Sequence, residues 1–143
     1  MMFEGCRLRP GTFQIIAACR RDGLDVAGPI TVETLAPLLE RARREHKTWK
    51  SPNVANTVAI LNCLARTKRL LDILDRERSP KNPGLPDLFL WRRGKDGVFG
   101  GRFVEVKRRK GKWKERQSKE QREEIAFLRR EGAKAMVVYL LQR

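Results

Sequence analysis

The sequence predicts an α/β fold, in which a small mixed sheet is flanked by helices and is preceded by a helical N-terminal region. Two observations lead to this prediction. Apolar residues recur at helical spacing through the first half of the 143-residue chain, and three short apolar runs rich in strand-forming residues follow at 85–91, 101–107 and 135–141. The first two runs are expected to form a hairpin. A helical pattern separates the last two, so we expect a right-handed crossover that makes those strands parallel.

The length of the chain suits one compact domain. We assign residues 1–50 to a helical N-terminal region and residues 51–143 to a core, and the sequence leaves open whether the two pack as one unit. Residues 1–12 show no clear period and are expected to form an irregular arm. The apolar stretch from Phe13 to Arg21 predicts a short helix.

Two further helical stretches precede the strands. Thr31 is a good N-cap for a helix that runs to about His46. Pro37 lies inside this helix, which therefore begins later or bends. Residues 51–74 form a longer helical pattern, which fits one buried helix or two in sequence. The turn-forming segment 77–84 then leads to the first strand.

The connections of the second half carry clear local signals. Residues 92–100 contain three glycines and are expected to form a mobile hairpin loop. Residues 108–114 are expected to form a basic loop. Ser118 can cap the next helix, with Gln121 completing a capping box, and Gly132 ends that helix.

The composition limits the function classes. A net charge of +15 indicates a polyanionic partner, and residues 92–130 hold fifteen Lys and Arg against six Asp and Glu. Three widely spaced cysteines fit neither a disulfide framework nor a zinc site, and His46 is the single histidine. No apolar run has membrane-spanning length and the N-terminus lacks the apolar core of a signal peptide. We therefore expect no membrane partner and no secretion. The expected location is the cytoplasm, in association with the nucleoid, or the nucleus if the source is a eukaryote.

Three charged residues of the predicted hairpin suggest its chemistry. Asp87 begins the first strand, and Glu105 and Lys107 lie two residues apart in the second. Alternate side chains of a strand point to the same face, so Glu105 and Lys107 share a face and the hairpin brings Asp87 close to Glu105. Two such carboxylates suit a divalent ion such as Mg²⁺, with the lysine placed to orient water or to stabilise negative charge. The alternative is a surface hairpin with a simple Glu–Lys ion pair.

A family resemblance rests on these residues and on three later elements. Residues 84–88 read Gly-Leu-Pro-Asp-Leu, residues 104–107 read Val-Glu-Val-Lys, and Gln121, Gly132 and the strand residues 137–138 follow in order. This pattern resembles a virus-type replication-repair nuclease (VRR-NUC) domain of the PD-(D/E)XK superfamily, and especially the C-terminal nuclease domain of the Fanconi-associated nuclease. The resemblance covers about residues 55–141 and implies a restriction-endonuclease-like core.

The resemblance also implies roles for four residues. Asp87 and Glu105 would be ligands of Mg²⁺ or Mn²⁺, Lys107 the catalytic lysine, and Gln121 an active-site residue of the following helix. For Gln121 the alternative is the purely local capping role. The family also supplies a third carboxylate from an upstream helix, for which Glu33 in Val-Glu-Thr-Leu-Ala is the nearest match; its alternative is an exposed first-turn residue stabilised by the helix dipole.

Contacts with nucleic acid are expected in the basic loop. Its cations would bind phosphates, and its tryptophan would stack on a base or else dock on its own domain. The residues assigned to this role are Arg108, Arg109, Lys110, Lys112, Trp113 and Lys114.

Together these features predict a metal-dependent DNA endonuclease or exonuclease that hydrolyses phosphodiester bonds, on branched or flap-like DNA in repair or replication. The alternative is a catalytically weak or inactive DNA-binding fragment of a larger repair nuclease. A homodimer is a further hypothesis, because a domain of this size covers only a short piece of duplex.

Overall fold

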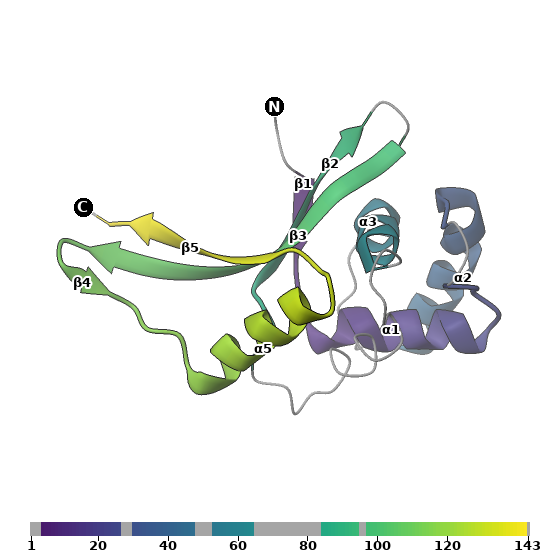
Figure 1. Cartoon of the computed structure of the whole chain (residues 1–143). Coiled ribbons are helices and arrows are strands. Elements are labelled where there is room, and N and C mark those ends of the chain that lie inside the picture. Colours follow the sequence, from purple (N-terminus) through teal and green to yellow (C-terminus); the bar gives the residue numbers. More distant parts are fainter. Residues whose placement is uncertain (1–3, 27–29, 48–52, 65–83, 95–96, 143) are drawn as a thin grey trace.

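A mixed five-stranded sheet forms the centre of the computed structural model, which describes residues 4–26, 30–47, 53–64, 84–94 and 97–142. The strands are β1 (Glu4–Arg7), β2 (Leu88–Gly94), β3 (Gly97–Lys110), β4 (Trp113–Lys114) and β5 (Ala135–Leu141). β3 is antiparallel to β2 and to β4 and parallel to β5, while β1 is antiparallel to β2 (Figure 1). The predicted α/β fold with a mixed sheet is confirmed, as is the parallel pairing across the last helix.

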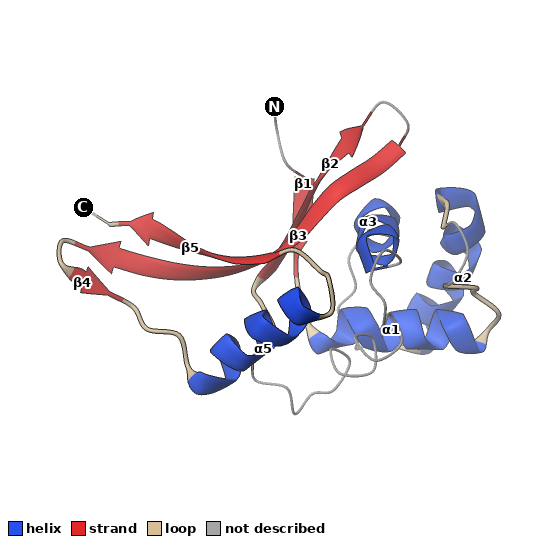
Figure 2. Cartoon of the chain, viewed as in Figure 1, coloured by secondary structure: helices blue, strands red, loops and turns tan. Residues whose placement is uncertain are grey.

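The described helices gather on one side of the sheet in the view of Figure 2. They are α1 (Pro10–Arg21), α2 (Val32–Glu45), α3 (Val54–Leu64) and α5 (Lys119–Arg130). Thr31 caps α2 as predicted, because its hydroxyl oxygen accepts a hydrogen bond from the Thr34 amide at 3.2 Å. The helix begins at Val32 and contains Pro37, so a later start is wrong. The predicted helical continuation to residue 74 and most of the turn-forming segment 77–84 lie outside the described residues.

The core lies between the sheet and α1 and α3. Phe89, Trp91 and Phe103 are completely buried or nearly so, whereas Leu88 and Leu90 of the opposite face are partly exposed. The Trp91 indole also donates a hydrogen bond to the Asn56 side chain of α3 at 2.8 Å, so the buried polar groups satisfy each other. In the described residues, no helix is long and apolar enough to cross a membrane.

The N-terminal segment corrects one prediction. The prediction that residues 1–12 form an irregular arm is wrong. β1 pairs with β2, with Glu4 opposite Trp91 at one end and Arg7 opposite Leu88 at the other, and α1 begins at Pro10. The four residues of β1 carry no alternation of apolar side chains. Their pairing depends on backbone hydrogen bonds to a strand more than eighty residues away, which a local pattern does not report.

The two loops expected on either side of β3 are also corrected. Residues 92–100 are not one loop, because β2 continues to Gly94 and β3 starts at Gly97. Residues 108–114 are not a loop either: Arg109 pairs with Lys114 and Lys110 with Trp113, around a turn in which Gly111 has a φ of 58°. Glycine adopts this positive φ without steric cost, which permits the tight reversal.

The result is a projection from the sheet, visible at the left of Figure 1. It combines the end of β3, the turn, β4 and the end of β5, and we call residues 108–114 with 139–141 the finger. The finger extends β3 beyond the helices, so its side chains are largely exposed.

Candidate active site

Asp87 is held in position by two backbone groups. It lies directly before β2, whose first residue Leu88 pairs with Val104, so Asp87 is next to Glu105 of β3. One carboxylate oxygen of Asp87 accepts a hydrogen bond from the Val106 amide at 2.9 Å. Its carbonyl oxygen accepts another from the Leu8 amide at 2.7 Å. The carboxylate is therefore fixed against β3 before any ligand binds.

Glu105 is a buried carboxylate with only 1% of its surface exposed. Its Oε1 atom lies 3.3 Å from Gln121 Nε2 and 3.5 Å from Lys107 Nζ. Its Oε2 atom is buried and has no hydrogen-bond donor among the described residues. Burial is the first cause that raises the pKa of Glu105 from 4.5 to about 7. The Asp87 carboxylate is the second, because it accepts a hydrogen bond from the protonated form of Glu105 and repels the charged form, whereas Lys107 acts in the opposite direction.

Lys107 lies between two carboxylates. Its side chain is 7% exposed, and Nζ is 3.5 Å from Glu105 and 3.9 Å from Glu115. The shared face predicted for Glu105 and Lys107 is thus confirmed. A buried ammonium group needs such partners, because an unpaired charge in this environment is costly.

Glu115 was missed by sequence reasoning. It follows β4 and accepts hydrogen bonds from the backbone amide of Arg108 at 3.0 Å and from its guanidinium Nε at 3.3 Å. These bonds, that of the backbone first, lower the pKa of Glu115. Only the turn at Gly111 brings residue 115 back beside Lys107, so the signal that could have found it was that glycine within a basic run.

Gln121 performs the local capping role and also contacts Glu105. Its side-chain oxygen accepts from the Ser118 amide at 2.9 Å and its own amide donates to the Ser118 hydroxyl at 3.1 Å, which completes the capping box. Its Nε2 atom donates to Glu105. The Gln121 side chain therefore caps α5 and contacts β3, while its part in catalysis stays a prediction.

A second buried carboxylate lies one turn further along α5. Glu124 is completely buried and shares a face of the helix with Gln121, a spacing of three residues that could have indicated it. Gly84 packs against this part of α5: a Cβ atom at Gly84 would overlap the Glu120 carbonyl group and come within 3.2 Å of Glu124 Cβ. The close contact fixes α5 against the segment that leads to Asp87.

Glu33 lies elsewhere in the fold. It is an exposed residue in the first turn of α2, which packs on α1 and α3. Across residues 4–26, 30–47, 53–64, 84–94 and 97–142, no group of three or more His, Cys, Asp and Glu is arranged to hold a metal ion. The role of Glu33 as a metal ligand stays a prediction.

The residues at hand nevertheless fit a divalent cation. Asp87 and Glu105 present neighbouring carboxylates, and burial, followed by the proximity of Asp87, raises the pKa of Glu105. The buried Oε2 atom lacks a donor that would stabilise its charge. A hard cation with several waters of its own satisfies such oxygens with few protein ligands.

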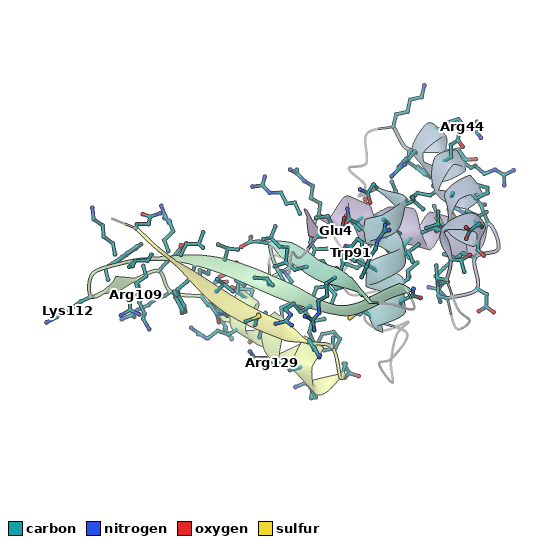
Figure 3. All side chains as sticks on the ribbon, turned by 90° about the horizontal axis from the view of Figure 1, so that it is seen from above. Glu4, Arg44, Trp91, Arg109, Lys112 and Arg129 are labelled. Atoms are coloured by element: carbon teal, nitrogen blue, oxygen red, sulfur yellow. The ribbon has the colours of Figure 1, made fainter. Side chains whose placement is uncertain are left out.

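The basic residues assigned to nucleic acid all lie on the finger. Figure 3 shows Arg109 and Lys112 at one end of the molecule and Arg44 at the other. Trp113 is 52% exposed, and the Arg108 guanidinium lies 5.9 Å from the centre of its ring. The tryptophan is therefore covered by a cation rather than by the core.

Comparison with known proteins agrees with this geometry. The model of the VRR-NUC domain family matches residues 32–140, which include all four catalytic candidates and Glu33. No curated protein matches the chain, so the finer resemblance to the Fanconi-associated nuclease stays a prediction. Since the matched segment covers most of the sequence, the chain belongs to the VRR-NUC domain family, and this membership implies a nuclease-type function in DNA processing.

Proposed function

We propose that this protein is a metal-dependent nuclease that hydrolyses phosphodiester bonds of DNA. The observation that carries the proposal is the pair of neighbouring carboxyl groups of Glu105 and Asp87, in which the buried Oε2 atom of Glu105 has no hydrogen-bond donor among the described residues. Buried charges in proteins are normally paired or coordinate a metal. When bound, Mg²⁺ or Mn²⁺ would lower the pKa of a coordinated water and neutralise charge on the phosphoryl group.

The side chains of the site divide the remaining tasks. Asp87 and Glu105 would hold the ion, and the hydrogen bond from the Val106 amide fixes the position of the Asp87 carboxylate. Lys107 presents a buried positive charge next to Glu105, where it would orient the attacking water or stabilise the developing negative charge. Gln121 restricts the rotation of Glu105 through one hydrogen bond.

The finger supports DNA as the substrate. Its cations at 108–110 lie on the same strand as Glu105 and Lys107, so phosphates bound there would continue into the catalytic site. The family resemblance supports branched or flap-like substrates in repair or replication. A homodimer stays a hypothesis, and light scattering coupled to size-exclusion chromatography tests it: a strict monomer with full activity on four-way junctions would remove it.

A second candidate is a DNA-binding fragment with weak or absent catalysis. The observation in its favour is the position of Glu33, exposed on α2, because a site with two carboxylates holds a metal less firmly than one with three. Such a fragment would gain activity when joined to the missing part of a larger nuclease.

Cleavage of labelled DNA separates the two candidates. We would compare flap, four-way-junction and single-stranded substrates with Mg²⁺ or Mn²⁺, using the native chain, Asp87→Ala and Lys107→Ala. Arg44→Ala is the matched control, because Arg44 is an exposed residue at the opposite end of the molecule from the finger. Cleavage by the native chain and the control, lost in both site variants with DNA binding retained, supports the nuclease. Salt-sensitive binding with no cleavage under any metal supports the fragment.

A further inference from the structure

A groove opens beside the catalytic face of β3. It has a volume of about 770 Å³ and lies between β4, the segment that follows it, the N-terminal half of α5 and β5. Its lining residues are Lys112, Trp113, Lys114, Glu115, Arg116, Gln117, Arg122 and Tyr139. Tyr139 is the cross-strand partner of Lys107, so the two side chains point to the same face of the sheet. The groove is therefore a direct continuation of the site around Lys107.

The groove is strongly cationic. Four of its eight lining residues are Lys or Arg. Glu115 is the acidic member, and its carboxylate already accepts hydrogen bonds from Arg108 and lies 3.9 Å from Lys107 Nζ. The exposed side chains of Lys112, Lys114 and Arg116 thus have no matching negative charge within the lining, which suits a ligand that carries phosphates.

Tyr139 adds an aromatic surface to this groove. Tyr139 is 41% exposed, and the Lys114 ammonium lies 5.1 Å from the centre of its ring. Such a ring offers a stacking surface for a nucleobase, while the nearby ammonium is free to turn to a phosphate. Trp113 borders the same groove, but it pairs with Lys110, so its side chain points to the sheet face opposite that of Tyr139. On that face its ring is covered by Arg108.

The dimensions suit a nucleotide rather than a duplex. Pockets for ligands of nucleotide size have volumes of roughly 300 to 1,000 Å³, and this groove falls in that range. A base inside a duplex is paired and stacked on its neighbours, so its face can reach a ring in a groove only when the nucleotide is unpaired or turned out.

We infer that this groove binds an unpaired nucleotide next to the scissile phosphate, with its base on Tyr139 and its phosphates on Lys114 and Arg116. The inference rests on the proposed nuclease function and makes its substrate more specific. DNA with a single-stranded segment beside the cleaved bond binds better than a blunt duplex of the same length.

Binding without divalent metal tests the inference. Two duplexes of equal length, one blunt and one with a short overhang that carries 2-aminopurine, are titrated with protein in EDTA at fixed salt. We compare the native chain with Tyr139→Ala, with Tyr139→Phe, which keeps the ring, and with Leu140→Ala. Leu140 is the matched control, because it is an exposed neighbour on β5 that points to the opposite face.

The native chain is expected to bind the overhang more tightly and to quench the 2-aminopurine fluorescence. Tyr139→Ala should weaken binding of the overhang duplex about tenfold, with no change for the blunt duplex and with loss of quenching. Tyr139→Phe and Leu140→Ala should behave like the native chain. Equal losses on both duplexes, or an overhang preference that survives Tyr139→Ala, would overturn the inference.

The same proteins are then tested for cleavage, which separates this inference from the proposed function. Overhang binding that depends on Tyr139, without cleavage under Mg²⁺ or Mn²⁺, supports the groove and removes the nuclease. Cleavage by a protein whose metal-free binding does not depend on Tyr139 supports the nuclease and removes the groove.

Discussion

Gln121 donates a hydrogen bond from Nε2 to Oε1 of Glu105 at 3.3 Å, while its side-chain oxygen remains bound to the amide of Ser118. The start of α5 is thereby linked to β3. A shift of this helix end would move Glu105, so the capping box contributes to the geometry of the site as well as to the stability of the helix.

Removal of the two partners of this box should have different results. Ser118→Ala loses the cap, which costs about 1 kcal/mol of unfolding free energy, but it leaves the bond from Gln121 to Glu105. Gln121→Ala keeps that cap, because the backbone amide of residue 121 still donates to Ser118. It loses the side-chain bonds to the Ser118 amide and to Glu105, so cleavage should fall as well. Urea unfolding and cleavage rates of both variants check this. Equal cleavage by the two proteins would contradict a role of Gln121 at the site.

Replacement of Glu105 should stabilise the metal-free protein. The pKa of this carboxyl is raised from 4.5 to about 7 in the folded state, so between these pH values the folded protein binds more protons than the unfolded chain. Stability therefore falls as the pH rises from about 4.5 to 7, and the loss is complete above that range. Glu105→Gln removes the free-energy cost of burying a charged carboxylate, which we expect to be about 1 to 3 kcal/mol at pH 8. This gain corresponds to a rise of a few degrees in melting temperature.

Calorimetry in EDTA at pH 5 and pH 8 measures this effect. Glu105→Gln should melt above the native chain at pH 8, and the gap should shrink at pH 5, whereas cleavage should be abolished. A gap of the same size at both pH values would show that the charge of Glu105 is not its source.

Glu115 should act by positioning Lys107. Glu115→Gln removes the charge 3.9 Å from Lys107 Nζ but retains groups that can bond to Arg108. We expect a lower kcat with KM for DNA unchanged or reduced, because a negative charge near the DNA is also removed. The loss should be smaller than that of Lys107→Ala, which we expect to be about a hundredfold or more.

The matched control for Glu115 is Glu123→Gln. Glu123 is exposed on α5 and lies 3.9 Å from Lys119, away from Lys107. Steady-state kinetics of the three variants should leave Glu123→Gln at the native rate. A kcat of Glu115→Gln equal to that of this control would exclude the positioning role.

The cations of the finger should set the salt dependence of DNA binding. Arg109→Ala and Lys112→Ala should each reduce the slope of log K against log salt concentration by about 1, as expected for one lost phosphate contact. Arg44→Ala removes the same charge at the far end of the molecule (Figure 3) and should leave the slope unchanged. Equal slopes for all three variants would place the DNA elsewhere.

The sequence predicted those elements whose signals are local. Thr31 and Ser118 are caps in the structure, and the apolar run 135–141 is β5 with the bounds expected. Gly84 and Asp87 belonged to the motif that suggested the family. In each case a few adjacent residues determine the local structure, because helix caps and strand propensity depend on residues close together in the sequence.

Features that depend on distant pairing were missed. β1 pairs with β2 through its backbone, and β4 exists because Gly111 reverses the chain within a run of cations. The contact of Glu115 with Lys107 follows from that reversal, and the burial of Glu124 follows from the packing of α5 against Gly84. Apart from the three-residue spacing between Gln121 and Glu124, none of these contacts leaves a period in the sequence.

The central claim is that Asp87 and Glu105 hold one divalent cation. Electron paramagnetic resonance of Mn²⁺, titrated at pH 8 into the native chain, Asp87→Asn, Glu105→Gln and the control Glu123→Gln, tests it without DNA. We expect saturable binding to the native chain and to the control, and loss of that binding in the two site variants. Equal Mn²⁺ affinity in all four proteins would contradict a metal site at Asp87 and Glu105.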